Sequence, residues 1–507
     1  MKPPLISRPL GLHQHREHGV TMVLVAVAMV AIIAIAALSI DVITLYLARE
    51  EAQRSADAAA LAAARILSVS GITGDPSNSS TLWTVVCGGT SSVASQAAQA
   101  VGMQNSVGGP APTVTTAYSA GSGGTVSSNA DCTQLASTTA FGVNPIVTVQ
   151  VRQPSLPTFF SRVWGTTGNS VTATASAEAF NPSNSENVGN VATGTPIPVQ
   201  PRCVKPWAVP NQDPLHNNSG GFGPLGTCIG GNPGPNGCAK IVNLANGSIV
   251  RAGISVNGNG AGVIGETFWL NPDCRYSGAS CIMRVPTPQA NFTNGTIFMK
   301  GPPTFANLIF APGQVGTPVT AVPSCASGDD FTEAIAGCDS PTNYTCGLPP
   351  GSGGTNVVDL RENPDSEIAD GVSCLIHQGD VTTFTDTTGQ DYLNHNLTPF
   401  GTPSDYPFQI LAGSSNPLVS AGVGRGSPIS VSPSIVSLPI YDESTPISAG
   451  TTTPVTFVGF LQVFINAVDQ YGNVNVTVLN VAGCGNNATG NPVAGSSPVP
   501  VRLITPP

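Results

Sequence analysis

Carboxylate side chains gather in two short stretches of the chain, and paired carboxylates are what glycoside hydrolysis and calcium binding both need. The two stretches contain Asp329, Asp330, Glu333 and Asp339, and then Glu362, Asp365, Glu367 and Asp370. Both lie near cysteines in a chain of which only 9% of the residues are charged. We therefore interpret them as solvated loop acids rather than as a catalytic pair or a calcium site.

A second candidate for chemistry is His377, which lies close to Asp380 and Cys374 in the sequence. A histidine beside a thiol can activate it as a nucleophile. The usual enzyme signatures are absent, however: there is no G-x-S-x-G, no H-E-x-x-H, no phosphate-binding glycine loop and no dinucleotide fingerprint. We predict that the protein is not an enzyme, and that it has no catalytic residue and no cofactor.

The chain has 12 cysteines, and an even number in an exported region is typical of disulfide bonds. A zinc site is the alternative, but there is no C-x-x-C pair and only His216, His377 and His395 lie in the last 400 residues. We therefore expect disulfides and no metal ion, with the pairing left open. The cysteines are Cys87, Cys132, Cys203, Cys228, Cys238, Cys274, Cys281, Cys325, Cys338, Cys346, Cys374 and Cys484.

The composition limits the classes of protein that the chain can represent. Charged residues are rare compared with the ~25% of ordinary domains, and the formal net charge is −10. A negative chain does not neutralise phosphates, so we expect no nucleic-acid partner. With 57 Gly, 45 Pro and 41% hydrophobic residues, the sequence favours strands and turns joined by long loops.

The first structural element that the sequence predicts is an apolar segment, residues 20–40, which has no charge, no Gly and no Pro. As a helix it would be ~32 Å long and would span the hydrocarbon core of a bilayer. No Gly or Pro lies between Gly19 and Gly71, so the helix should continue well beyond the membrane.

The orientation of this segment follows mainly from what comes after it. Positive charges flank both ends, so the positive-inside signal is weak by itself. The cysteines and the acidic bulk indicate that residues 1–19 are a cytoplasmic tail and that residues 41 onward are exported, in the periplasm. A cleaved signal peptide is the alternative, but its apolar core is only 7–15 residues long. We expect a single uncleaved span in the inner membrane.

Small residues mark one face of the helix beyond the membrane: Ala52, Ala56, Ala59 and Ala63. Such a face lets another element approach closely. The partner is either the helix's own domain or another subunit in an assembly, and the sequence leaves both open. We add Asp41, at the membrane exit, and Asp57, within the helix, to these candidate anchoring and packing residues.

Four blocks of this helix carry a resemblance to a known family: residues 16–19 (R-E-H-G), 39–42 (S-I-D-V), 45–49 (L-Y-L-A-R) and 53–64 (Q-R-S-A-D-A-A-A-L-A-A-A). Together they resemble the N-terminal region of TadG-like (TadE/TadG-type) Flp (Tad) pilus-assembly proteins over residues 16–67. One departure is Leu24, since type IV pilins carry Glu five residues after the glycine. The resemblance implies a bacterial setting and other pilus-assembly proteins as partners.

The expected fold is α+β: a long transmembrane helix that continues into a pilin-like helix-on-sheet region, followed by a β-rich exported region with disulfides. Alternating residues predict strands at 146–151 and 171–179, whose Val and Ala faces suit a sheet beneath the Ala-rich helix. A hairpin is predicted at 455–481, with its turn at 470–473. The expected regions are 1–19 (tail), 20–40 (span), 41–70 (exported helix extension), 71–180 (pilin-like), 181–201 (linker) and 202–507 (β-rich).

Two functions remain as hypotheses. The first is a structural or assembly component of a Tad-type pilus that acts through helix packing and protein–protein contacts. The alternative is an envelope or secreted protein that binds a glycan or a surface. Its support is the Asn- and Gly-rich loops and the aromatic residues Trp207, Trp269 and Tyr344, which we expect to be exposed.

Overall fold

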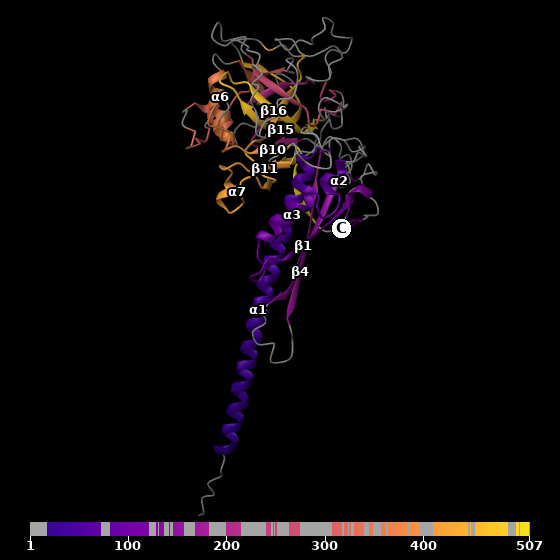
Figure 1. Ribbon diagram of the computed structural model, residues 1–507, viewed down its shortest axis with the longest axis vertical. Coiled ribbons are helices and arrows are strands. Elements are labelled where there is room, and N and C mark those ends of the chain that lie inside the picture. Colours follow the sequence, from indigo (N-terminus) through magenta and orange to yellow (C-terminus); the bar gives the residue numbers. More distant parts are fainter. Residues whose placement is uncertain are drawn as a thin grey trace, which may run out of the picture.

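The protein consists of one long helix with the folded parts gathered at its C-terminal end (Figure 1). The computed structural model describes only part of the chain, and the statements below concern that part. It covers residues 18–71, 73, 82–120, 128–129, 131–135, 141, 145–156, 168–181, 199–213, 240–244, 247, 249–250, 263–273, 307–316, 319–322, 324–325, 329–338, 344–347, 356–360, 364–382, 386–394, 409–444, 447, 452–484, 493–495 and 497–505.

The helices and strands fall into a mixed N-terminal unit and a mainly β C-terminal unit. The helices are α1 (His18–Val69), α2 (Leu82–Cys87), α3 (Val93–Gln104), η2 (Cys132–Gln134), α5 (Asp330–Ala336), α6 (Pro364–Ile376) and α7 (Pro417–Ser420). The strands are β1 (Thr113–Ala120), β2 (Ser128–Asn129), β3 (Pro145–Leu156), β4 (Asn169–Ala179), β5 (Val199–Pro201), β6 (Trp207–Pro210), β7 (Thr267–Pro272), β8 (Asn307–Pro312), β9 (Val357–Asp359), β10 (Tyr392–Asn394), β11 (Gln409–Leu411), β12 (Pro428–Ile429), β13 (Ile435–Tyr441), β14 (Thr452–Pro454), β15 (Phe457–Val468), β16 (Val474–Gly483), β17 (Val493–Gly495) and β18 (Val501–Ile504).

Helix α1 runs without a break for 52 residues, or about 78 Å at 1.5 Å per residue. Its interior is rich in Ala, Leu, Val and Ile and contains no helix-breaking residue beyond Gly19. Gly71 follows the helix with φ of 72°, a left-handed conformation that glycine adopts without strain. The long N-terminal helix predicted from the sequence is confirmed.

The first sheet has the strand order β18-β4-β3-β1-β2 and lies against α1 and α3. Strands β3 and β4 are antiparallel, and their register pairs Val149 with Ala175 and Val151 with Ala173. These side chains are buried and point to the helix side of the sheet. Alternation of apolar and polar residues thus gives each strand one core face, as a period of two requires.

The edge strand of this sheet comes from the other end of the chain. Strand β18 pairs antiparallel with β4, with Leu503 opposite Ala177. Arg502 of β18 forms an ion pair with Glu178 of β4. Most of the expected linker, residues 181–201, lies outside the described residues. The regions before and after it both contribute strands to this sheet, β4 from the first and β18 from the second.

A closed barrel with the order β13-β15-β16-β7-β8-β6 forms the second unit. Its core is buried Val, Ile, Leu and Phe side chains. The predicted hairpin is confirmed as β15 and β16, with Val468 opposite Val474. In its turn, Asp469 Oδ1 accepts hydrogen bonds of 2.9 Å from the backbone N–H groups of Tyr471 and Asn473, which holds the turn closed.

The end of α1 is fixed to this barrel. The Asn480 side chain of β16 donates a 2.7 Å hydrogen bond to the Ser68 carbonyl, and the Ser68 hydroxyl donates one of 2.7 Å to the carbonyl of Val499. Val69 packs in a cluster with Leu479 and other apolar residues of the barrel side. The helix, the first sheet and the barrel are therefore joined by buried contacts as well as by chain connections.

Candidate membrane anchor and helix packing surface

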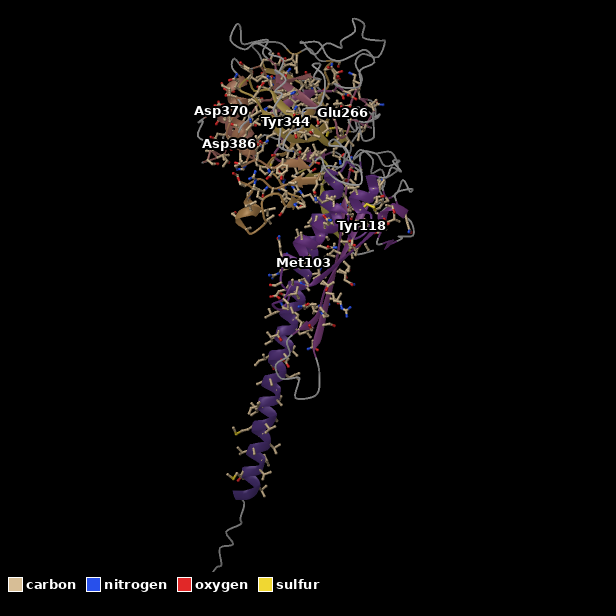
Figure 2. The ribbon with its side chains drawn as sticks, in the orientation of Figure 1. Met103, Tyr118, Glu266, Tyr344, Asp370 and Asp386 are labelled. Carbon is tan, nitrogen blue, oxygen red and sulfur yellow. A yellow bond between two sulfur atoms is a disulfide. The ribbon has the colours of Figure 1, made fainter. Side chains whose placement is uncertain are left out.

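The first half of α1 has an exposed apolar surface. Met22 is 77% exposed, Ile35 66% and Tyr46 65%, values that a soluble core helix does not show. Figure 2 shows the side chains of this half projecting from the helix, away from the folded parts. By length and composition the helix is able to cross a membrane, and it is the one such helix in the described part of the chain. The arrangement is that of a membrane anchor.

The second half of α1 buries its small face inside the same chain. Ala52, Ala56, Ala59 and Ala63 are each fully buried, in one core with α3 and with strands β3 and β4. The approach of α3 is close, because a methyl group on Gly102 would lie only 3.4 Å from Cβ of Ala59. The sequence left two possible partners for this face, the helix's own domain or another subunit. In the structure, the helix's own domain covers it.

A buried hydrogen bond accompanies this helix contact. The Ser55 hydroxyl of α1 donates to the Gly102 carbonyl of α3 at 2.9 Å. A carbonyl near a helix end has no partner within its own helix, so a hydroxyl from the neighbouring helix supplies one. Sequence reasoning missed Ser55, which looked like a departure from an Ala pattern. A serine in an alanine face is the signal that could have identified it.

The two acidic candidates on α1 lie at different levels of the helix. Asp41 is 6% exposed and shares a covered stripe with Ala37 and Ala48. Asp57 is half-buried, and its Oδ1 accepts a 2.8 Å hydrogen bond from the Gln53 amide. They are 16 residues apart along one helix, about 24 Å, so they do not form a common site.

Along α1, the exposed charged residues begin at Arg49, which lies between Asp41 and Asp57. Arg54 and Glu50 form a surface ion pair at 3.7 Å, and the Glu51 carboxylate accepts a 2.8 Å hydrogen bond from the backbone N–H of Gly108. An exposed pair of this kind stabilises little. The exposed charges distinguish this part of α1 from the uncharged exposed surface that precedes it.

Four disulfides connect distant parts of the described chain: Cys87–Cys132, Cys203–Cys338, Cys325–Cys374 and Cys346–Cys484. The disulfide with the largest sequence separation, 138 residues, joins Cys346 in a loop to Cys484 at the end of β16. The candidates Cys228, Cys238, Cys274 and Cys281 lie outside the described residues. None of the described cysteines is free, so Cys374 has no thiol with which to act beside His377.

The aromatic residues expected to be exposed are buried, so that expectation was wrong. Trp207 is fully buried and its ring lies 5.9 Å from that of Phe310 in the barrel core. Tyr344 is also fully buried, edge-on to Phe457 at 5.0 Å. Trp269 is 2% exposed. Large aromatic rings are stabilised by burying their apolar area. The polar residues that neighbour them in the sequence did not indicate that these rings would be buried.

The acidic stretches belong partly to helices rather than to loops. Asp329 is the N-cap of α5, where Oδ2 accepts hydrogen bonds from the backbone N–H groups of Phe331 and Thr332. Glu333 is buried on α5 and accepts from the Val322 N–H. Asp370 lies on α6, and Asp339 and Glu362 lie outside the described residues. Within the described part of the chain, no group of three or more acidic, His or Cys residues could hold a metal ion.

Two buried groups in the barrel unit have shifted ionisation. Burial lowers the pKa of Lys205 to about 7, and its ammonium donates a hydrogen bond to the Gly337 carbonyl. Burial raises the pKa of Glu443, although the adjacent Lys240, to which it is ion-paired, acts in the opposite direction. Lys205 thus contacts a backbone carbonyl, and Glu443 contacts Lys240, both within the barrel unit.

Comparison with known proteins gives one match, and it falls on α1. No curated protein and no solved structure matches the chain. Residues 19–65 match the family model Tad, described as "Putative Flp pilus-assembly TadE/G-like", which confirms the TadG-like resemblance over that segment.

Proposed function

We propose that the protein is a structural or assembly component of a Flp (Tad-type) pilus system, anchored in the inner membrane by one helix. The main observation behind this proposal is that α1 has two different surfaces, an exposed apolar one in its first half and a buried Ala face in its second half. The residues matching the pilus-assembly family include both the exposed apolar half and the buried Ala face. The same helix therefore anchors the protein and forms the centre of its first folded unit.

The proposed orientation has residues 1–19 in the cytoplasm and residues beyond the span in the periplasm. Four disulfides support export of the folded part, since such bonds persist in oxidising compartments.

The mode of action that we propose is packing and protein–protein contact without chemistry. A long helix whose upper half lies on one antiparallel sheet is the layered arrangement of pilin-like subunits, by analogy. We propose other pilus-assembly proteins as the partners. We do not propose glycan binding, because the three aromatic residues that supported it are buried.

Fractionation and genetics test this function. The full-length protein should behave as an integral membrane protein, and protease added to spheroplasts should remove everything beyond the span. A strain lacking the protein should lose its Flp-type pili and regain them when the wild-type chain is supplied. A soluble, shortened product would overturn the anchor, and normal piliation in the deletion strain would overturn the pilus role.

A further inference from the structure

The exposed apolar surface of α1 continues beyond the predicted span. Four residues after Asp41 are large, apolar and exposed: Val42 (56%), Ile43 (58%), Tyr46 (65%) and Leu47 (52%). We call these four residues the collar. The predicted span ended at residue 40, because Asp41 was taken as the point where the helix leaves the membrane. The exposed surface gives a different boundary, between Leu47 and Arg49.

The length of this surface fits a whole bilayer rather than its hydrocarbon core alone. From Val20 to Leu47 the helix rises ~40 Å at 1.5 Å per residue. The hydrocarbon core is ~30 Å thick, and with the headgroup regions the bilayer measures ~40–45 Å. The collar therefore lies at the depth of the headgroups, and Tyr46 is the kind of amphipathic residue that is enriched there.

The polar groups of this segment are suited to a low-dielectric surrounding. The Ser39 hydroxyl donates a 2.9 Å hydrogen bond to the Ile35 carbonyl, and the Thr44 hydroxyl donates one of 2.9 Å to the Asp41 carbonyl. Both hydroxyls are thus satisfied within the helix and need no water. Groups that lack water must find such partners, since leaving them unpaired costs several kcal/mol.

The single charge in the segment faces away from the collar. Asp41 is 6% exposed and lies on the covered stripe with Ala37 and Ala48, which continues downward from the buried Ala face. A carboxylate facing lipid is costly, and one that faces protein is tolerated. The helix at this level therefore has a protein side, which holds the charge, and an open side, which carries no charge and on which the Tyr46 hydroxyl is the one polar group of the collar.

We propose that the lipid headgroup region of the bilayer covers the collar, so that the folded exported part rests directly on the membrane instead of standing above it on a helical stalk. This inference depends on the membrane span of the proposed function. Its basis is the continuity of the collar with the exposed apolar surface of the span, together with the matching length.

A second copy of the chain is the other conceivable occupant of the collar. Helices that associate within membranes meet through small residues, which allow close approach. The collar has only large side chains, and the small face of α1 is already covered by α3 and the first sheet. The size of the side chains therefore favours lipid over a neighbouring helix.

Site-specific photocrosslinking tests the proposal. Full-length protein carrying p-benzoylphenylalanine at position 46 would be reconstituted in vesicles of phosphatidylethanolamine and phosphatidylglycerol, irradiated and analysed by mass spectrometry. Position 30, in the middle of the span, and position 54, on the charged and exposed part of α1, are the matched controls. Protease resistance under non-reducing conditions would show that each variant is folded.

The expected result is lipid adducts at positions 30 and 46, with about tenfold fewer at position 54, which lies beyond the ~45 Å of the bilayer. Lipid adducts at 30 but not at 46 would overturn the proposal and leave the span intact. Crosslinked dimers at 46 would overturn it in favour of a second copy. An absence of lipid adducts at 30 would reject the span itself, and the proposed anchor with it.

Discussion

Replacing Ala59 with Leu should destabilise the contact between α1 and α3. Ala59 is fully buried, and a methyl group on Gly102 opposite it would already be in van der Waals contact at 3.4 Å. Leu adds three carbon atoms at a position that is fully enclosed by the core between α1, α3 and the first sheet. Leu and Ala have nearly the same helix propensity, so the change reports packing rather than helix formation. Overpacking of a well-filled core costs about 1–3 kcal/mol.

The assay is the urea concentration at which detergent-solubilised full-length protein loses its protease resistance. With a slope of about 1–3 kcal/mol per M, the midpoint for Ala59→Leu should fall by ~1 M. Ala31→Leu is the matched control, since it makes the same change on the same helix at an exposed position in the span. An unchanged midpoint for Ala59→Leu would refute the close approach of α3. An equal fall in the control would show that packing is not the cause.

Three further predictions concern the barrel unit and its connection to α1. Changing Cys346 and Cys484 together to Ser removes a bond across 138 residues and should lower the free energy of unfolding by about 2–5 kcal/mol; a urea midpoint equal to that of the wild type would contradict this. Asn480→Ala removes the buried hydrogen bonds to Ser68 and Thr73 and should cost about 1–3 kcal/mol, measured as earlier proteolysis. Asn105→Ala, which removes an exposed hydrogen bond to the Val101 carbonyl, should cost about 0.5 kcal/mol or less. Burial lowers the pKa of Lys205 from 10.5 to about 7, so between those values the unfolded state binds more protons and stability rises with pH. Between pH 7 and 9 the free energy of unfolding of the wild type should therefore rise by about 2 kcal/mol relative to Lys205→Met, and parallel pH profiles for the two proteins would contradict the shift.

Local patterns predicted those elements that depend on local spacing. The absence of Gly and Pro predicted α1, and alternating Val and Ala predicted β3 and β4. The predicted turn at 470–473 identified the β15–β16 hairpin. In each case the signal lies in the same continuous stretch of chain as the element that it predicts, so composition and periodicity are enough.

Elements whose partners are far away in sequence could not be predicted in this way. The barrel closes through parallel pairs, β13 with β6 and β7 with β8, that join segments separated by long connections. Strand β18 returns to the first sheet from the end of the chain. Four residues of ordinary strand composition contain no information about such a partner, and the pairing of the cysteines is unreadable for the same reason.

The candidate residues on α1 could likewise be identified from the sequence, whereas the elements that contact them could not. Spacing predicted that the Ala face is a packing surface, and in the structure the same chain covers it, but small residues suit a neighbour in another subunit equally well. Likewise, the position of Asp41 suggested the membrane exit, whereas the exposed collar beyond it leads us to propose an exit about two turns later. The type and spacing of residues thus specify that a face is covered, and only the three-dimensional fold specifies what covers it.

The extent of the family match has a consequence for where pilus partners should bind. The match ends at residue 65, just before the residues that fix α1 to the barrel, Ser68 and Val69. The shared segment therefore contains the span and the Ala face, and both are occupied under our proposals: the span by lipid and the Ala face by the chain itself. If the protein acts through contacts with other assembly components, those contacts would use either the exposed charged stretch of α1 at Arg49–Arg54 or surfaces outside the shared segment. The barrel, held rigidly to α1 by buried hydrogen bonds and projecting furthest from the anchor (Figure 1), is the unit on which to search for them.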